Sequence, residues 1–260
     1  MGSNTDMKVA IITGGASGIG LATALTLSRR QDWEVHIMDL NPPEASLIFH
    51  QVDVTDYSAL GQTFKDIFQL HGRLDFVYAN AGVVEQNDEF YQTSNEDPPP
   101  LPKSMSKVID VCLTSAATTA YLAQHYLRKT PGEKSLIFTA SCGALYPAYG
   151  APIYTATKHG VLGLMRAMAP RLWRNDNVRV NAVLPGTVKT NLHTEENWKQ
   201  FPEKYFTPVE KIVEAVLILL DGTEMGKAIE CCGQNHYYRE QYEYCDDTMR
   251  AVMSSTDVGN

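Results

Sequence analysis

The chain has 260 residues, of which 44% are hydrophobic and 20% are charged, as in an ordinary soluble globular protein. This length suffices for one domain with a sizeable core, and because no break in composition marks a second, we expect residues 1–260 to form a single domain. The formal net charge of −8 disfavours binding to nucleic acids or anionic membranes, because proteins that bind them usually carry a basic surface.

The N-terminus and the cysteines indicate a cytoplasmic location. The first residues, MGSNTDMKVAIITGG, enter a strand pattern almost at once, without a signal peptide. No apolar run approaches the roughly 18 residues that span a bilayer. The five cysteines are odd in number and lack the spacing of metal ligands, which fits reduced thiols. We therefore expect no membrane span and no bound metal.

Strand and helix patterns alternate along the chain. Such alternation implies right-handed crossovers and a parallel sheet covered on both faces. The expected class is therefore α/β, with a single Rossmann-type doubly wound parallel sheet. The expected strands lie at 8–15, 34–40, 74–82, 135–141 and 178–186, with an edge strand at 227–233, and the expected helices lie at 18–30, 57–72, near 103–128, near 152–173 and near 208–220.

Three segments interrupt this regular pattern. The Pro-rich, acidic stretch QTSNEDPPPLPKS (92–104) is expected to be a loop. Pro170 should kink the helix near 152–173 or end its regular part. The tail after about residue 234 is acidic and rich in tyrosine, and its pattern predicts no position in the fold.

A glycine cluster, TGGASGIG (13–20), lies where the first strand passes into the first helix. Glycines allow a tight turn and let the backbone approach a pyrophosphate, whose charge the helix N-terminus favours. Many α/β turns are rich in glycine, so the cluster alone is a weak signal. The strand–turn–helix context is the one that a dinucleotide site requires.

Asp39 ends the second strand, where a carboxylate would bind a ribose 2′-hydroxyl and repel a 2′-phosphate. No Arg or Lys lies in the glycine cluster or directly after Asp39 to hold such a phosphate. The alternative is that Asp39 only caps a helix. The pattern favours NAD over NADP as the cofactor.

These motifs resemble the short-chain dehydrogenase/reductase family over most of the chain. The resemblance rests on Thr-Gly-x-x-x-Gly-x-Gly at 13–20, VDV at 52–54, NAG at 80–82 and PGTVKT at 185–190. YTATKHGVLGLMRAMA, VRVNAVLPGTVKT and GKAI are most similar to the hydroxyprostaglandin dehydrogenase (NAD⁺)-like branch. The cofactor contacts implied are Gly14, Ser17, Gly18, Ile19, Gly20, Asp39, Leu40, Asp53, Val54, Asn80, Ala81, Gly82, Tyr154, Lys158, Pro185, Gly186, Val188 and Thr190.

Ser141, Tyr154 and Lys158 have the catalytic spacing of that family. Hydride transfer between a carbinol and a nicotinamide needs a group that takes up or supplies the hydroxyl proton. Tyr154 would be this acid/base, and Lys158, one helical turn on, would lower its pKa; a shift of about 2–3 units needs about 3–4 kcal/mol. Ser141 would orient the substrate oxygen. The alternative is a surface Tyr–Lys pair.

Cys112 departs from the family pattern. In VIDVCLTS (108–115) it occupies the position of an asparagine that the family associates with a helix irregularity and a water leading to the lysine. One interpretation is a silent replacement in the core, because cysteine behaves mostly as a small hydrophobe. The other is an altered proton path, on a scaffold open to a new role.

The substrate side is rich in aromatic residues. A lid is expected near 191–207, and mobile lids exclude water during a reaction. Aromatic residues there suggest a bulky apolar substrate, although they could equally pack the lid onto the core. The candidate substrate contacts are Leu145, Tyr149, His193 and Trp198.

These observations predict an NAD-dependent enzyme that interconverts a secondary alcohol and a ketone on a bulky hydrophobic substrate of the lipid, steroid, terpenoid or polyketide type, in the oxidative direction. The alternative is a dinucleotide-binding scaffold without redox turnover, serving as a binding module or for a non-redox rearrangement. The resemblance implies a homodimer or homotetramer through the helices near 103–128 and 152–173.

Overall fold

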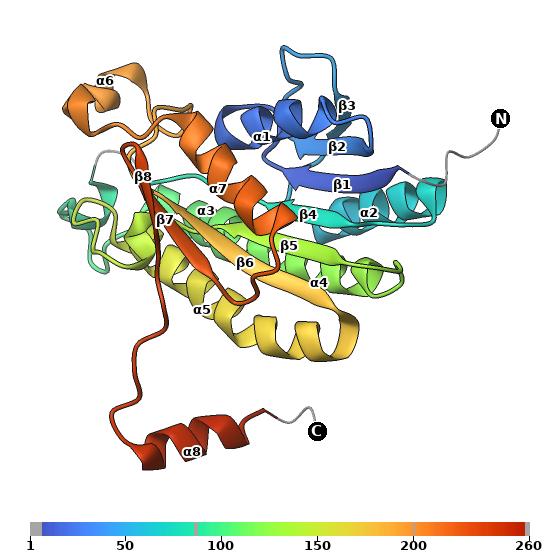
Figure 1. Cartoon of the computed structure of the whole chain (residues 1–260). Coiled ribbons are helices and arrows are strands. Elements are labelled where there is room, and N and C mark those ends of the chain that lie inside the picture. The colour runs from blue at the N-terminus through green and yellow to red at the C-terminus, as the bar shows by residue number, and fades with distance from the viewer. Residues whose placement is uncertain (1–6, 86–87, 200, 258–260) are drawn as a thin grey trace.

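The sheet of this protein follows the doubly wound order (Figure 1). The computed structural model describes residues 7–85, 88–199 and 201–257. Within them, parallel strands run from β3 to β7, and β8 pairs antiparallel with β7. The order across the sheet is β3 (Ile48–Gln51), β2 (Trp33–Asp39), β1 (Lys8–Thr13), β4 (Phe76–Ala79), β5 (Lys134–Thr139), β6 (Val178–Pro185), β7 (Ala228–Cys232) and β8 (Asn235–Tyr238). The expected Rossmann-type α/β fold is confirmed.

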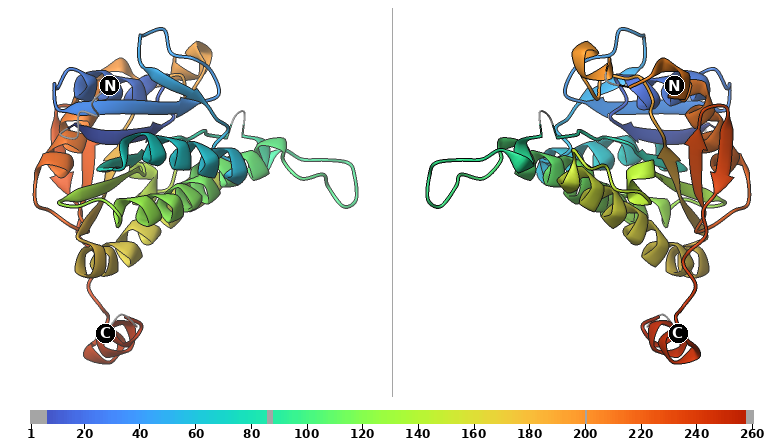
Figure 2. Two further views of the ribbon diagram at one scale, coloured as in Figure 1. Left: turned by 90° about the vertical axis from the view of Figure 1, so that its right-hand side faces the viewer. Right: turned by 90° about the vertical axis from the view of Figure 1, so that its left-hand side faces the viewer.

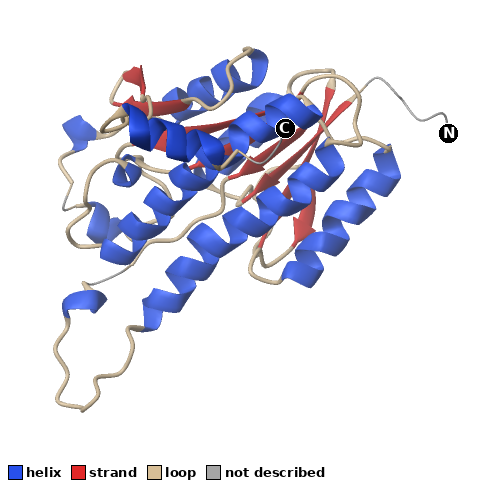
Figure 3. Cartoon of the chain, turned by 90° about the horizontal axis from the view of Figure 1, so that it is seen from below, coloured by secondary structure: helices blue, strands red, loops and turns tan. Residues whose placement is uncertain are grey.

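Helices cover both faces of the sheet (Figure 3). Helices α1 (Gly18–Ser28) and α7 (Val209–Asp221) pack on one face, and α2 (Tyr57–His71), α4 (Ser115–Leu127) and α5 (Pro152–Asp176) on the other. Each face of the sheet has its own hydrophobic core, and the side chains of β1 alternate between them. Val9 and Ile11 point to the core under α2, α4 and α5, and Ala10 and Ile12 point to the core under α1 and α7. Nearly every residue of the inner strands is buried, which is why the strands read as continuous apolar runs.

The helix expected near 103–128 has an irregular centre. It begins as α3 (Lys103–Ile109), passes through a π-helical segment at Asp110–Thr114 (η2) and continues as α4. Such segments are frequent at functional sites.

Pro170 does not end its helix, because α5 continues to Asp176. A proline removes one N–H and leaves the carbonyl four residues earlier without that partner. Pro170 is exposed, so the affected carbonyl lies on a side of the helix that water reaches.

The strand at 227–233 was wrongly expected to lie at the edge of the sheet. β8 pairs with β7 and forms the edge instead. The chain then runs away from the body to α8 (Asp247–Ser255), where an Arg174–Asp257 ion pair of 2.7 Å ties it to α5 (Figure 1). The pattern of β8 was uninformative because all four of its residues are exposed.

Short helical turns complete the chain: η1 (Glu89–Tyr91), η3 (Cys142–Ala144), α6 (Glu195–Trp198) and η4 (Glu203–Tyr205). The Pro-rich segment is the expected loop only from residue 92 to residue 102, because Lys103 and Ser104 already belong to α3, and the loop projects far from the body (Figure 2). No helix in the described part of the chain combines the length and apolarity needed to cross a membrane.

The strand order reverses between β1 and β4, and ligands of open α/β sheets bind beside the carboxyl ends of the strands at such a point. Asn80, directly after β4, joins the ends of β1 and β4 through its side-chain amide. The amide nitrogen donates to the carbonyls of Thr13 (3.2 Å) and Gly14 (3.1 Å). The Thr13 hydroxyl in turn accepts the N–H of Asn80 at 3.1 Å. The two halves of the sheet are therefore fixed to one another at the edge where a ligand would bind.

Candidate functional site

A cavity of about 790 Å³ opens along this edge of the sheet. It extends from the glycine turn and the end of β2, past the residues after β4 and β5, to the segment at 191–201. Of the cofactor residues expected from the sequence, all but Gly20 line it. The motifs, although scattered along the chain, therefore come together around one space.

Two glycines of the turn have left-handed backbones, with φ of +63° at Gly14 and +52° at Gly18. A Cβ on Gly14 would lie 2.8 Å from Ala81 Cα, and one on Gly18 would lie 3.1 Å from Thr190 Cγ2. Gly20 does not reach the cavity because it packs against the carbonyl of Gly14. The turn thus presents bare backbone at the N-terminus of α1, a cradle that fits a pyrophosphate.

Asp39 connects the end of β2 to this turn. Its carboxylate accepts the N–H of Ala16 at 3.0 Å and of Leu40 at 2.8 Å, so it holds the glycine turn and is not merely a helix cap. Among the described residues that line the cavity, Lys107 and Lys158 are the cationic side chains, from α3 and α5. Among the described residues, the part of the cavity wall formed by β2 and the glycine turn therefore contains no Lys or Arg side chain near Asp39.

Asp53 and Val54 follow β3 and line the same end of the cavity. The Asp53 carboxylate accepts both the N–H and the hydroxyl of Thr55, at 2.9 and 2.7 Å. These bonds hold the short turn between β3 and α2 beside Asp39.

Ser141, Tyr154 and Lys158 meet at the centre of the cavity. Ser141 follows β5, and its hydroxyl accepts the N–H of Gly143 at 3.0 Å. Tyr154 lies in the first turn of α5, and Lys158 Nζ lies 5.5 Å from the centre of its ring. Lys158 also donates to the carbonyl of Thr139 at 2.9 Å. The lysine is therefore fixed beside the tyrosine and is not part of a solvated surface pair.

Burial opposes the charged forms of both Tyr154 and Lys158. Desolvation raises the pKa of Tyr154 above its usual value, against the effect of a hydrogen bond from Ser141. Desolvation likewise lowers the pKa of Lys158. A positive charge brought beside Tyr154 would favour its phenolate.

Glu85 holds the start of α5, the helix that carries Tyr154 and Lys158, a role that the sequence does not predict. Its buried carboxylate accepts the N–H groups of Tyr154 at 2.6 Å and of Ile153 at 3.2 Å. A carboxylate at a helix N-terminus satisfies free donors and complements the helix dipole. Because Glu85 lies 69 residues from Tyr154, no local pattern could have linked them.

Thr139 connects the part of the cavity wall around Asn80 to the part around Lys158. Its hydroxyl lies 2.9 Å from Asn80 Oδ1 and 2.7 Å from the Tyr78 hydroxyl, and its carbonyl holds Lys158. One residue thus fixes both the amide that bridges β1 and β4 and the lysine.

Cys112 lies within the π-helical segment, where the family resemblance places a helix irregularity. Its buried thiol donates to the carbonyl of Val83 at 3.0 Å and accepts the N–H of the same residue at 3.3 Å. A Cβ on Gly82 would lie 3.5 Å from Lys158 Nζ and 3.8 Å from Cys112 Sγ, so these two groups flank Gly82. Cys112 is thus more than a silent apolar replacement, because it joins the helix to the loop after β4.

The expected substrate residues occupy different environments. Tyr149, His193 and Trp198 line the cavity, whereas Leu145 does not and packs against the core. Trp198 is 5% exposed, and its indole N–H donates to the carbonyl of Thr190 at 2.8 Å. His193 packs on Trp198, with their ring centres 4.6 Å apart. The indole therefore anchors the segment at 191–201 to the loop after β6.

A second unexpected contact fixes the loop between Ser141 and Tyr154. The hydroxyl of Tyr146 donates to the buried Glu230 at 3.4 Å and accepts from Arg239 at 3.2 Å. Glu230 and Arg239 also form an ion pair. The end of β8 thus supports a loop that lines the cavity.

The sequence also matches known proteins. The family model of the short chain dehydrogenases matches residues 8–201. The short-chain dehydrogenase/reductase prx7 of Penicillium rubens is 40% identical over 93% of this chain and 97% of its own length. Human 15-hydroxyprostaglandin dehydrogenase [NAD(+)] is 33% identical over 75% of each chain.

The fold is similar to solved structures. Ligand-free aldohexose dehydrogenase of Thermoplasma acidophilum has a TM-score of 0.72 at 22% identity, covering 88% of this chain and 93% of its own. ElxO with NADP bound has a TM-score of 0.73 at 22% identity, covering 86% of this chain and 96% of its own. With the family match over most of its length, the chain belongs to the short-chain dehydrogenase/reductase family of oxidoreductases.

Proposed function

We propose that the protein is an NAD-dependent dehydrogenase that oxidises a secondary alcohol on a bulky hydrophobic molecule to the ketone. The observation that carries the proposal is the single cavity joining the glycine turn and Asp39 to Ser141, Tyr154 and Lys158. The same cavity continues beneath the segment at 191–207, which we take to be a lid.

The preference for NAD rests on Asp39. A carboxylate at the end of β2 can accept a ribose hydroxyl but repels a 2′-phosphate, and the lysines on the cavity wall lie on α3 and α5. The human relative named above carries NAD⁺ in its name. ElxO was solved with NADP, but at 22% identity it is informative about the fold alone.

When bound, the cofactor would supply the hydride acceptor and a positive charge. The glycine turn would hold its pyrophosphate, and Val188 and Thr190 after β6 would approach its carboxamide. Tyr154 would take the hydroxyl proton from the alcohol, with Lys158 favouring the phenolate and Ser141 orienting the oxygen. Lys158, fixed by Thr139, would remain protonated and hold the ribose.

The substrate class rests on the side chains around the catalytic end of the cavity. Tyr149, Trp198 and Phe201 line it, and they suit a large apolar ligand oriented by a few polar groups. We also propose a cytoplasmic location, in line with cysteines that are odd in number and lack the spacing of metal ligands.

The alternative of a scaffold without redox turnover rested on Cys112 alone. Its bonds to Val83 give this residue a structural role compatible with catalysis. We therefore favour the dehydrogenase.

Replacing Tyr154 by Phe should lower kcat by about 10³-fold, because the proton acceptor is lost. The assay follows the absorbance of reduced nicotinamide with a panel of hydrophobic secondary alcohols. Tyr242→Phe, at an exposed tyrosine after β8 and away from the cavity, is the matched control and should retain full turnover. Turnover that survives Tyr154→Phe would contradict the mechanism. Cofactor binding without turnover of any alcohol by the wild-type protein would favour the scaffold.

The wild-type enzyme should prefer NAD over NADP, and Asp39→Asn should reduce the ratio of their kcat/KM values by about 100-fold, because the repulsion of the 2′-phosphate is removed. Asp32→Asn removes the same charge just before the other end of β2 and should leave the ratio unchanged. A wild-type preference for NADP would refute this interpretation of Asp39.

Replacing Cys112 by Asn should preserve or raise turnover, because an amide can both donate to and accept from the backbone of Val83. Cys112→Ala removes both bonds and should lower turnover. Steady-state kinetics of the two variants provide the test, with thermal melting as the check on folding. A large loss of activity in Cys112→Asn would contradict the hypothesis that this position belongs to a path that carries protons to Lys158.

We also propose a homodimer or homotetramer through the helices at 103–127 and α5. Exposed aromatic residues on them, Tyr121 and Trp173, support an interface there. Light scattering should give two or four times the mass of the chain. A monomer at micromolar concentration would argue against it.

A further inference from the structure

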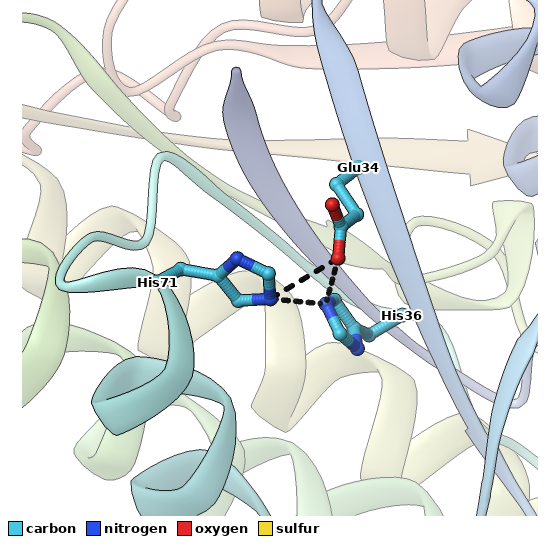
Figure 4. A group of neighbouring side chains, drawn as sticks. All are labelled: Glu34, His36 and His71. Atoms are coloured by element: carbon cyan, nitrogen blue, oxygen red, sulfur yellow. Dashed lines mark hydrogen bonds and ion pairs between the residues drawn. The ribbon is translucent and has the colours of Figure 1, made fainter. Parts of the chain in front are cut away.

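A cluster of metal-binding side chains lies outside the cofactor cavity, between β2 and the end of α2 (Figure 4). Glu34 and His36 are two positions apart on β2, so their side chains share one face of the sheet. His71 is the last residue of α2, which covers that face. None of the three belongs to the cavity lining.

The three ligand atoms converge on one point. His36 Nε2 lies 3.0 Å from His71 Nε2, and Glu34 Oε1 lies 3.2 Å from His71 Nε2 and 3.5 Å from His36 Nε2. A tetrahedral zinc ion with bonds of about 2.0–2.1 Å separates its ligand atoms by about 3.3 Å. The triangle therefore has the dimensions of one face of a zinc tetrahedron.

Hydrogen bonds account for only part of this triangle. His36 Nε2 and His71 Nε2 can share one hydrogen bond at 3.0 Å, and His71 Nε2 lies 3.2 Å from Glu34 Oε1. The single proton of His71 Nε2 cannot be donated fully to both partners, and the 3.5 Å between Glu34 Oε1 and His36 Nε2 exceeds the usual length of an N–H···O hydrogen bond. A cation bound to all three atoms would take the place of that shared proton.

His50 supplies the support that a metal-binding histidine requires. His36 Nδ1 lies 3.0 Å from His50 Nε2 across the β2–β3 pair, so His36 can donate its Nδ1 proton and keep the Nε2 lone pair for a metal. His50 lies on β3 and is the neighbour that fixes the orientation of the buried His36 ring.

The three side chains differ in exposure, so that the site is buried on the His36 side and open to solvent on the Glu34 side. The side chain of His36 is 2% exposed, that of His71 16% and that of Glu34 31%. The buried histidine gives the site rigidity, and the more exposed carboxylate leaves a route for the ion and room for a water ligand. Two histidines and one carboxylate are a donor set that zinc uses with one open position.

We propose that Glu34, His36 and His71 bind one divalent transition-metal ion of the zinc type, with water as the fourth ligand. The ion would tie β2 to the end of α2 and, through His50, to β3. The sequence predicts no metal because the ligands come from two elements, β2 and α2, lie up to 37 positions apart and form no recognisable motif.

The test uses the full-length, untagged protein, stripped with a chelator and then dialysed. Elemental analysis after equilibration with micromolar ZnCl₂ should find one zinc per chain. At a zinc concentration about 100 times the dissociation constant, the melting temperature should rise by about 5 °C. Co²⁺ in place of zinc should produce the visible d–d bands of a four-coordinate site. Absence of stoichiometric zinc from the wild-type protein would overturn the proposal.

Variants separate this site from unspecific metal binding. His71→Ala and Glu34→Gln should each abolish the cobalt bands and the rise in melting temperature, whereas His50→Gln should weaken zinc binding by about 10-fold. His125→Ala, which removes an exposed histidine of α4, is the matched control and should bind like the wild type. Circular dichroism checks that each variant is folded. Unchanged cobalt bands in a folded His71→Ala variant would refute the assignment of the ligands.

Discussion

The bridge that Asn80 makes between the ends of β1 and β4 is the constraint on which the rest of the site depends. At the reversal of strand order β1 and β4 are neighbours, but the helices α1 and α4 that follow them lie on opposite faces of the sheet. One side-chain amide holds both carbonyls of the Thr13–Gly14 turn. The carbonyl of that same amide contacts Thr139, whose backbone oxygen holds Lys158. The positions of the glycine turn and of Lys158 are thus set by one continuous chain of hydrogen bonds.

A second set of contacts positions α5, the helix that carries Tyr154 and Lys158. Glu85 satisfies the first N–H groups of α5, and Cys112 joins the π-helical segment to Val83, two residues before Glu85. The loop after β4 is therefore held both to the π-helical segment and to α5. Several independent contacts thus fix Tyr154 and Lys158 in position, although burial opposes the charged forms of both side chains.

The sequence predicted the fold and the composition of the cavity wall because their signals are local. The glycine turn, Asp39 and the Ser141–Tyr154–Lys158 spacing each lie within a short motif, and the alternation of elements brings the motifs to one edge of the sheet. Glu85, Thr139 and the Tyr146–Glu230–Arg239 contacts escaped prediction because each joins residues that are distant in sequence and that no motif marks. β8 was missed because its side chains are exposed, so burial left no pattern.

The two ends of β2 show how one strand can serve two sites. Asp39 at its carboxyl end faces the cavity, as the geometry of parallel sheets directs. Glu34 and His36 lie near its amino end, outside the cavity. The buried His36 needs hydrogen-bond partners there, because burying an unpaired polar side chain is costly. His50 lies within hydrogen-bond distance of its Nδ1, and without a metal His71 lies within hydrogen-bond distance of its Nε2. A zinc ion would take the place of the contact between His36 and His71 without touching the cavity, so metal and cofactor would act on the same strand while making separate contacts.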